Sequence, residues 1–131
     1  MVRSFLLVIY LIFLSCTDKS DIYNHTDNVE NLGDDYYYLG DANESQILLN
    51  LKPKSGKRIG ITVIPAEVTN YNYDSQFIIA KTENSSNHIK EIRYWILDKR
   101  KKDVEPIFMD SIIFFKKVDS LNLKINLKKR N

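Results

Sequence analysis

The stretch Phe77-Ile78-Ile79-Ala80 places four apolar residues in succession and decides how the neighbouring segments are interpreted. Successive side chains of a strand point to opposite faces of the sheet, so an unbroken apolar run predicts a strand that is covered on both faces. The segment Ile89–Asp98 has the same property in its second half, where Trp95 and Leu97 share one face and Ile96 lies on the other. We therefore expect both segments inside a sheet with other parts of the chain packed against it.

Three further segments are short, rich in β-branched or aromatic residues and bounded by turn residues, which is typical of strands. Gln46–Leu51 and residues 58–64 follow one another across the turn Pro53-Lys54-Ser55-Gly56. Only two residues separate residues 67–73 from residues 76–82, a spacing that indicates a tight hairpin. Together these segments predict an antiparallel meander of about five strands.

A helical pattern replaces the strand pattern near the C-terminus. Asp110 is a suitable N-cap, and the apolar residues after it recur at helical spacing within one arc: Phe114, Phe115, Val118 and Leu121. We expect a helix over residues 110–121 that packs on one face of the sheet and leaves Ile113 exposed. The alternative is a further strand, because the segment also contains residues that favour β structure. The predicted fold class is α+β.

The chain is long enough for one domain beyond its N-terminal segments. We divide it into a signal peptide at residues 1–15, an acidic flexible tether at residues 16–34 and a single folded domain at residues 35–131. Residues 121–127 alternate between apolar and polar and predict an edge strand. Lys128-Lys129-Arg130 is expected in solvent beyond it.

The N-terminal residues indicate export and lipid attachment. Arg3 precedes an apolar run that ends at Leu14, which is shorter than the ~20 residues needed to cross a bilayer and is typical of a secretory signal peptide. Phe13-Leu14-Ser15-Cys16 resembles a bacterial lipobox, with Phe13 at a position where Leu is commonest. That resemblance implies cleavage before Cys16 and acylation of its sulfur with diacylglycerol, carrying chains such as palmitate. The alternative is an ordinary signal peptide that is cut elsewhere.

The distribution of charge suggests a basic surface. Eight acids and one base lie between Cys16 and Leu51, whereas residues 52–131 carry 17 bases and 9 acids. Either the acidic segment folds back on a basic face or that face meets a partner. The run of Lys99, Arg100, Lys101 and Lys102 is the candidate contact for an anionic lipid, an acidic polysaccharide or an acidic protein. The alternative is a solvated loop.

Aromatic residues supply a second candidate surface. Tyr71 and Tyr73 alternate on one predicted strand, and tyrosines are frequent where proteins contact other proteins. The alternative is half-buried packing within the sheet.

The sequence contains no catalytic, cofactor or metal motif that we recognise. His25 falls in the predicted tether and His88 in a polar loop, so neither is placed as a general base beside a carboxylate. The single cysteine and the two histidines do not supply a zinc ligand set. We expect no enzyme, no bound metal or cofactor, and no nucleic-acid partner, since an exported protein rarely meets nucleic acid.

The order of these motifs resembles a family of small bacterial lipoproteins whose domain has no assigned function. The residues that carry the resemblance are the Cys16 lipobox, the Phe77-Ile78-Ile79-Ala80 run and Tyr94-Trp95-Ile96-Leu97-Asp98. It implies a lipid-anchored, extracytoplasmic protein of the cell envelope with no catalytic residue to carry over. We expect a non-enzymatic module that binds an envelope protein or glycan. The alternatives are an inhibitor or immunity-type lipoprotein that neutralises a hydrolase or toxin, and an enzyme whose polar residues converge only in the fold.

Overall fold

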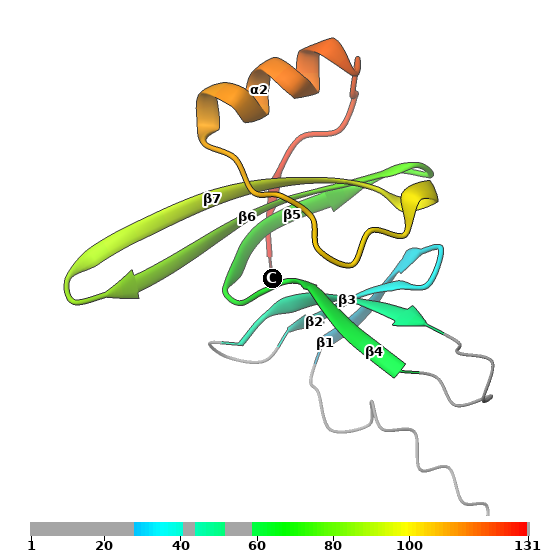
Figure 1. Ribbon diagram of the computed structural model, residues 1–131, viewed down its shortest axis with the longest axis horizontal. Helices are drawn as coiled ribbons and strands as arrows, with labels where there is room; N and C mark the ends of the chain where they lie inside the picture. Colours follow the sequence, from blue (N-terminus) through cyan, green and yellow to red (C-terminus); the bar gives the residue numbers. More distant parts are fainter. Residues whose placement is uncertain (1–27, 41–43, 52–58, 131) are drawn as a thin grey trace, which may run out of the picture.

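The computed structural model describes residues 28–40, 44–51 and 59–130. These residues form eight strands in two antiparallel four-stranded sheets, a short 3₁₀ turn and one helix, α2 (Figure 1). The predicted α+β class with a C-terminal helix is therefore confirmed. The single meander of about five strands is replaced by two sheets.

Sheet A contains the first four strands in the order β1-β2-β3-β4. Their bounds are Asn28–Gly33, Tyr36–Gly40, Gln46–Leu51 and Ile59–Ile64. Sheet B has the order β7-β6-β5-β8. Its strands are β5 (Val68–Tyr73), β6 (Phe77–Ser86), β7 (Ile89–Asp98) and β8 (Lys128–Lys129).

The chain changes sheets at the short connection between β4 and β5. Pro65 follows β4 and has no backbone N–H to continue a ladder. After this break, the Val68 N–H donates to the Ser45 carbonyl at 2.9 Å, which holds the start of sheet B against sheet A. This change of sheet explains why the strands do not form one meander.

The two sheets pack face to face around one apolar core. Ile47 and Leu49 of β3 contribute from sheet A, while Ile78 and Ala80 of β6 contribute from sheet B. Ile79 points to the opposite face of β6 and is also buried, at 1% exposure. The expectation that β6 is covered on both faces is confirmed.

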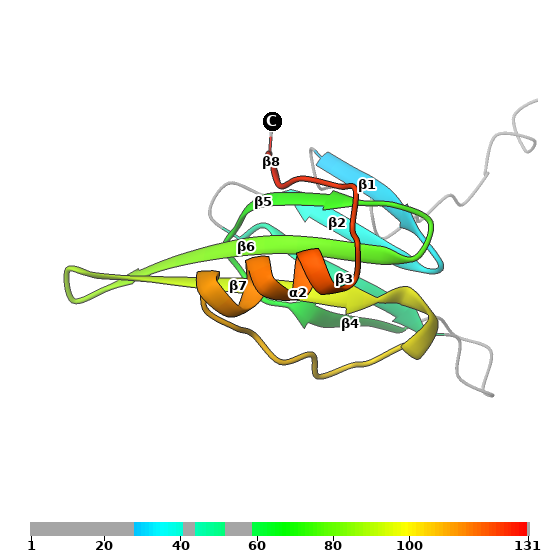
Figure 2. The same cartoon turned by 90° about the horizontal axis from the view of Figure 1, so that it is seen from above.

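Helix α2 forms a third layer on the outer face of sheet B. It spans Ser111–Ser120, and the Asp110 carboxylate caps it by accepting the Ile113 N–H at 2.9 Å. Phe114 is the buried side chain of the helix and packs on Tyr94 of β7, with 5.0 Å between ring centroids. Figure 2 shows α2 lying over β6 and β7. The helix is therefore favoured over the alternative of a further strand.

The segment before α2 closes part of the outer edge of β7. Met109 and Tyr94 exchange two backbone hydrogen bonds of 2.9 Å, an isolated antiparallel bridge. Beyond this bridge the hairpin of β6 and β7 projects from the body of the domain (Figure 1). Its turn consists of Asn87 and His88, which both have positive φ, at 51° and 66°. Such a pair of residues matches the twist of the strands they connect.

Two boundaries differ from the sequence-based expectation. Residues 28–33 were assigned to the tether, but they form β1, and Leu32 is fully buried. The folded part therefore begins before residue 35, because Leu32 is needed in the core. The rest of the expected tether, residues 16–27, lies outside the described residues.

The C-terminal tail also differs from the expectation. Leu123, Ile125 and Leu127 are half-buried, as their alternation suggests, but the edge strand β8 forms only at Lys128–Lys129, where it pairs with β5. Arg130 is not left in solvent: its backbone N–H donates to the Thr69 carbonyl at 3.1 Å, and its guanidinium pairs with Glu67. The backbone therefore pairs with β5 while the side chains of Lys128 and Lys129 stay exposed. Within the described part of the chain, no helix is long and apolar enough to cross a membrane.

Candidate functional site

The predicted basic run forms the turn after β7, and its first member is buried. The 3₁₀ turn comprises Lys99–Lys101, and Lys99 is only 2% exposed. Its ammonium donates to the Leu32 carbonyl and, at 2.6 Å, to the Asp74 carbonyl. The assignment of Lys99 to an interaction surface is therefore wrong, because its charge is used inside the domain. Burial lowers the pKa of Lys99 below its usual value, while Asp34 and Asp74 oppose the shift.

The approach of Lys99 explains a glycine on β1. Gly33 has φ of +86°, and a Cβ built there would lie 3.1 Å from the Lys99 Nζ atom. A side chain at this position would therefore strain the backbone and crowd the ammonium. Gly33 and Lys99 together join the end of β1 in sheet A to the end of β7 in sheet B.

Arg100 is engaged by the acid that caps the turn. Its Nε and Nη2 atoms donate to the two carboxylate oxygens of Asp98, at 3.0 Å and 2.8 Å. These bonds, with the Arg100 N–H bond to the same carboxylate, lower the pKa of Asp98 to about 2. The pair is neutral as a unit, so Arg100 adds little net charge to the surface.

Lys102 and Lys101 complete the run in different ways. The Lys102 ammonium donates to the Asp34 carbonyl and lies 5.2 Å from the centre of the Tyr36 ring. Lys101 is exposed and forms no ion pair with any described residue. Lys101 and Lys102 are therefore the members of the run that expose a charge with no acidic partner among the described residues, and they remain as candidates for the predicted basic surface.

The two predicted tyrosines form a contact between the sheets. The hydroxyls of Tyr71 and Tyr73 both donate to the Glu30 carboxylate on β1, Tyr73 at 3.0 Å. The Tyr71 ring stacks on Tyr38 with 4.3 Å between centroids. Both tyrosines are half-buried, so the structure agrees with the packing alternative. Burial and its hydrogen bond to Glu30 raise the pKa of Tyr71. The pKa of Tyr73 is also raised, mainly by its own hydrogen bond to Glu30.

A groove lies beside the basic turn, between α2 and sheet B. It encloses about 760 Å³ and is lined by strand residues, the turn, the segment that leads into α2 and the end of the helix. Its apolar lining includes Phe77, Ile96, Met109 and Leu121, and its charged lining includes Lys101 and Lys117. This volume falls within the usual range of small-molecule pockets.

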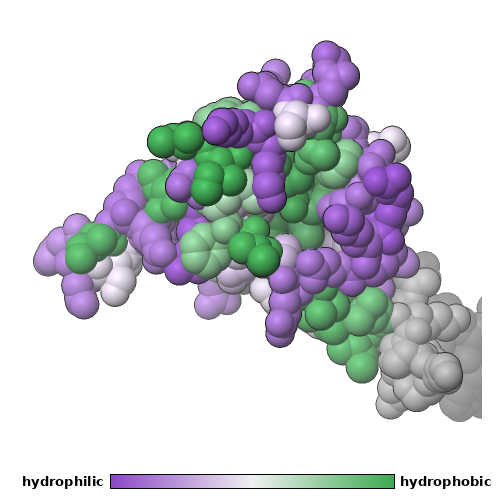
Figure 3. Space-filling view, turned by 45° about the horizontal axis from the view of Figure 1, so that its top comes forward, coloured by the Kyte–Doolittle hydropathy of each residue, from purple (hydrophilic) through white to green (hydrophobic). Residues whose placement is uncertain are grey.

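Apolar side chains also remain exposed around the groove. Figure 3 shows them gathered over α2 and the segment before it, interrupted by hydrophilic side chains. The most exposed are Ile107 at 82%, Ile112 at 75% and Phe115 at 55%. Phe108 lies instead on the core-facing side of β7, with its ring centroid 5.7 Å from that of Trp95 and the Arg93 guanidinium 4.0 Å from its ring centre. An apolar face of this kind is typical of an interaction site.

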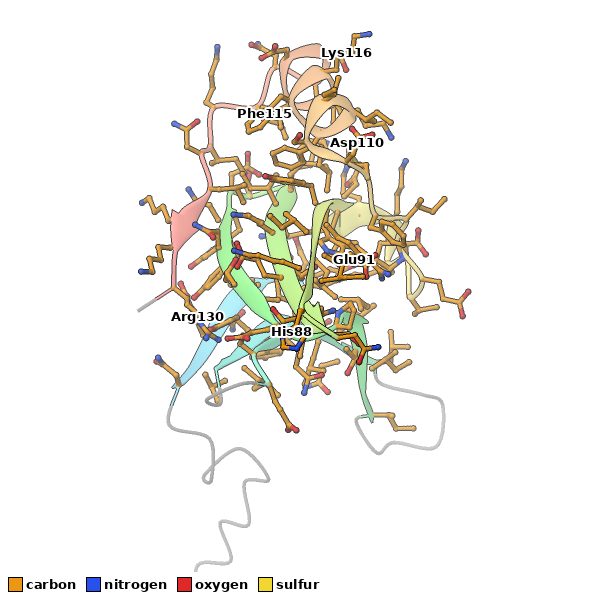
Figure 4. All side chains as sticks on the ribbon, turned by 90° about the vertical axis from the view of Figure 1, so that its left-hand side faces the viewer. His88, Glu91, Asp110, Phe115, Lys116 and Arg130 are labelled. Carbon is orange, nitrogen blue, oxygen red and sulfur yellow. The ribbon has the colours of Figure 1, made fainter. Side chains whose placement is uncertain are left out.

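Sequence reasoning did not identify this face. Ile113, expected to be exposed on the helix, is 47% exposed and was the available signal. The sequence contains no such signal for Ile107 and Lys117, because these residues line the groove only once α2 has packed on sheet B. Figure 4 shows Phe115 and Lys116 on α2, well separated from His88 and Arg130.

Cys16 and His25 lie outside the described residues. His88 is exposed in the β6–β7 turn. In the described ranges no three His, Cys, Asp or Glu side chains are grouped to hold a metal ion.

The fold and the site define a small two-sheet α+β domain with a groove beneath its single described helix. The chain belongs to the family described as Protein of unknown function (DUF3997), whose model matches residues 34–130. This match confirms the expected resemblance as far as it concerns a domain without an assigned function. No curated protein and no solved structure matches the chain significantly.

Replacing Lys99 tests whether its amine holds the two sheets together. In Lys99→Ala, the carbonyls of Leu32 and Asp74 lose a buried donor, so we expect the free energy of unfolding to fall by about 1–3 kcal/mol. The measurement is urea denaturation followed by tryptophan fluorescence. Lys101→Ala, on the exposed side of the same turn, is the control and should change stability by less than about 0.5 kcal/mol. Equal effects of the two substitutions would contradict the buried role of Lys99.

The tyrosine contact predicts a loss of stability at alkaline pH. The folded-state pKa of Tyr71 lies above the unfolded value of 10.0, so the native chain keeps a proton that the unfolded chain releases. Its stabilising contribution is complete below pH 10 and decreases as the pH rises further, by up to ~1.4 kcal/mol per pH unit. Urea denaturation between pH 8 and 11 should show a steeper decline for wild type than for Tyr71→Phe. Parallel curves would show that Tyr71 does not titrate differently in the two states.

Proposed function

We propose that the chain is a lipid-anchored module of the bacterial cell envelope that binds another protein and catalyses no reaction. The anchor is Cys16, the single cysteine of the chain, in the lipobox-like Phe13-Leu14-Ser15-Cys16. Acylation at this residue explains a lone cysteine in an exported chain, where an unpaired thiol otherwise needs a separate explanation. Two or more acyl chains hold a protein firmly on a membrane.

The exposed apolar face over α2 is the observation that favours a protein partner. Ile112, Phe115 and Ile107 are each more than half exposed, and a folded domain gains nothing from leaving such side chains in water. Aliphatic and aromatic side chains bury area against another protein more readily than against a hydrated glycan. A protein is therefore the better match to this face.

The position of the face relative to the anchor supports the same proposal. The described chain enters the domain at β1 in sheet A, whereas α2 lies on the opposite outer layer (Figure 1). Eleven residues lie between Cys16 and Asn28, and this stretch of chain reaches at most about 40 Å when extended. In the proposed arrangement the domain stays near the membrane, and α2 is available to a partner in the same compartment.

Metabolic labelling tests the anchor. Cells that express the chain with labelled palmitate should incorporate label into wild type and not into Cys16→Ala. The substitution should also shift the protein from the detergent-rich phase to the aqueous phase of a detergent extraction. Equal labelling of both proteins would overturn the lipid anchor.

Photo-crosslinking in intact cells tests the binding face. A benzoylphenylalanine at position 112 on α2 should give a discrete higher-mass adduct with one protein. The same probe at position 59 on β4 is the matched control, because Ile59 is a similarly exposed isoleucine, 54% against 75%, in the other sheet. No adduct at position 112, or identical adducts at both positions, would overturn α2 as the binding face.

A further inference from the structure

The groove exists because α2 is packed on sheet B mainly through one side chain. Phe114 fills the space between the first half of the helix and Tyr94. One turn later the corresponding side chain is Val118, which is shorter and only half-buried. The second half of the helix therefore leaves a space above the sheet, and Lys117 and Leu121 line it.

The lining of this space is mixed, with polar and charged side chains beside apolar ones. Its apolar part comes from Phe77 of β6 and Ile96 of β7, which belong to the sheet, and from Met109 and Leu121 at the two ends of the helical segment. The space is a slot bounded by sheet B, by the end of α2 and by the segment that connects β7 to α2. A slot of this kind admits a thin, flexible apolar chain more readily than a folded surface.

The charged residues at the slot favour an anion. Arg100, Lys101 and Lys117 contribute three positive charges, and Asp98 and Asp103 contribute two negative ones, so the net charge is +1. Arg100 and Asp98 neutralise one another through two hydrogen bonds. The Asp103 carboxylate accepts the Glu105 N–H at 3.0 Å within its own loop. Lys101 and Lys117 form no ion pair in the described part of the chain, and they remain available to a ligand.

We propose that this slot binds a fatty-acid carboxylate, with its acyl chain on Phe77, Ile96, Met109 and Leu121 and its carboxylate between Lys101 and Lys117. The proposal concerns the space beneath α2 and does not depend on a protein partner at the outer surface of the helix. The ligand combines the two properties of the site, since an apolar chain matches the apolar part of the lining and a single negative charge matches the net charge of +1.

The test is a titration of the intact chain in phosphatidylcholine nanodiscs with decanoate below its micelle concentration. Methyl NMR signals of Met109 and Leu121 should shift saturably, while the methyl signals of Ile59 on β4 should stay unchanged. Decyltrimethylammonium, which has the same chain and the opposite charge, should bind at least tenfold more weakly. Each methylene added to the carboxylate should strengthen binding, by up to about fourfold where it is fully buried.

Two lysines on α2 provide a matched pair of variants. Lys117→Glu should weaken decanoate binding about tenfold, because it places a negative charge beside the ligand carboxylate. Lys116→Glu makes the same change on the adjacent residue, which does not line the groove, and should alter the affinity by less than twofold. Thermal unfolding of both variants checks that the helix is intact.

Three outcomes would overturn the proposal. The first is no saturable shift at Met109 and Leu121 with decanoate, and the second is equal binding of decanoate and decyltrimethylammonium. The third is a shift with a short leucine–glutamate peptide and none with decanoate, which would assign the slot to a protein segment. A missing crosslink at position 112 would count against the protein partner alone and would leave this inference standing.

Discussion

The domain depends on the fact that β6 is buried on both faces. Ile78 and Ala80 face sheet A, and Ile79 faces the other way with 1% of its surface exposed. One covering layer cannot bury both sets of side chains, so the strand requires sheet A on one side and additional chain on the other. The three-layer arrangement follows, and α2 is recruited to the outer layer by Phe114. Because a ten-residue helix is shorter than the strands beneath it, the cover is incomplete and a groove remains.

Polar contacts hold the sheets at defined positions over this apolar core. Lys99 reaches from the end of β7 to carbonyls on both sides of the sandwich, and Glu30 on β1 receives two tyrosine hydroxyls from β5. Buried donors of this kind are specific because each one has few acceptors within reach. Part of the positive charge of the basic run is therefore used for structure, and the groove receives Lys101 from the run and Lys117 from α2.

Local patterns in the sequence were sufficient to predict some elements and insufficient for others. Gln46–Leu51, Ile89–Asp98 and the helix after Asp110 were predictable because their periodicity and capping residues are contained within each segment. β1 was missed because Asn28–Gly33 has few apolar residues, and Leu32 is buried only through its pairing with β2. In the sequence Lys99 cannot be distinguished from the solvated bases that follow it, because its burial depends on the contact with the Leu32 carbonyl in the folded domain. The groove was likewise not predictable, since it joins residues of β6, β7 and α2 that are distant in sequence.

The bridge between Met109 and Tyr94 has a consequence for self-association. An open strand edge offers unpaired amides and carbonyls to any other extended chain, and such edges promote aggregation. The backbone of Met109 occupies this edge beside the most apolar part of β7, where Trp95 and Leu97 enter the core. Farther out along the same edge, Lys90, Glu91 and Arg93 carry charge. The segment that leads into α2 therefore also disfavours edge-to-edge pairing at this part of β7, and the charges of the hairpin make the outer part of the same edge poorly adhesive.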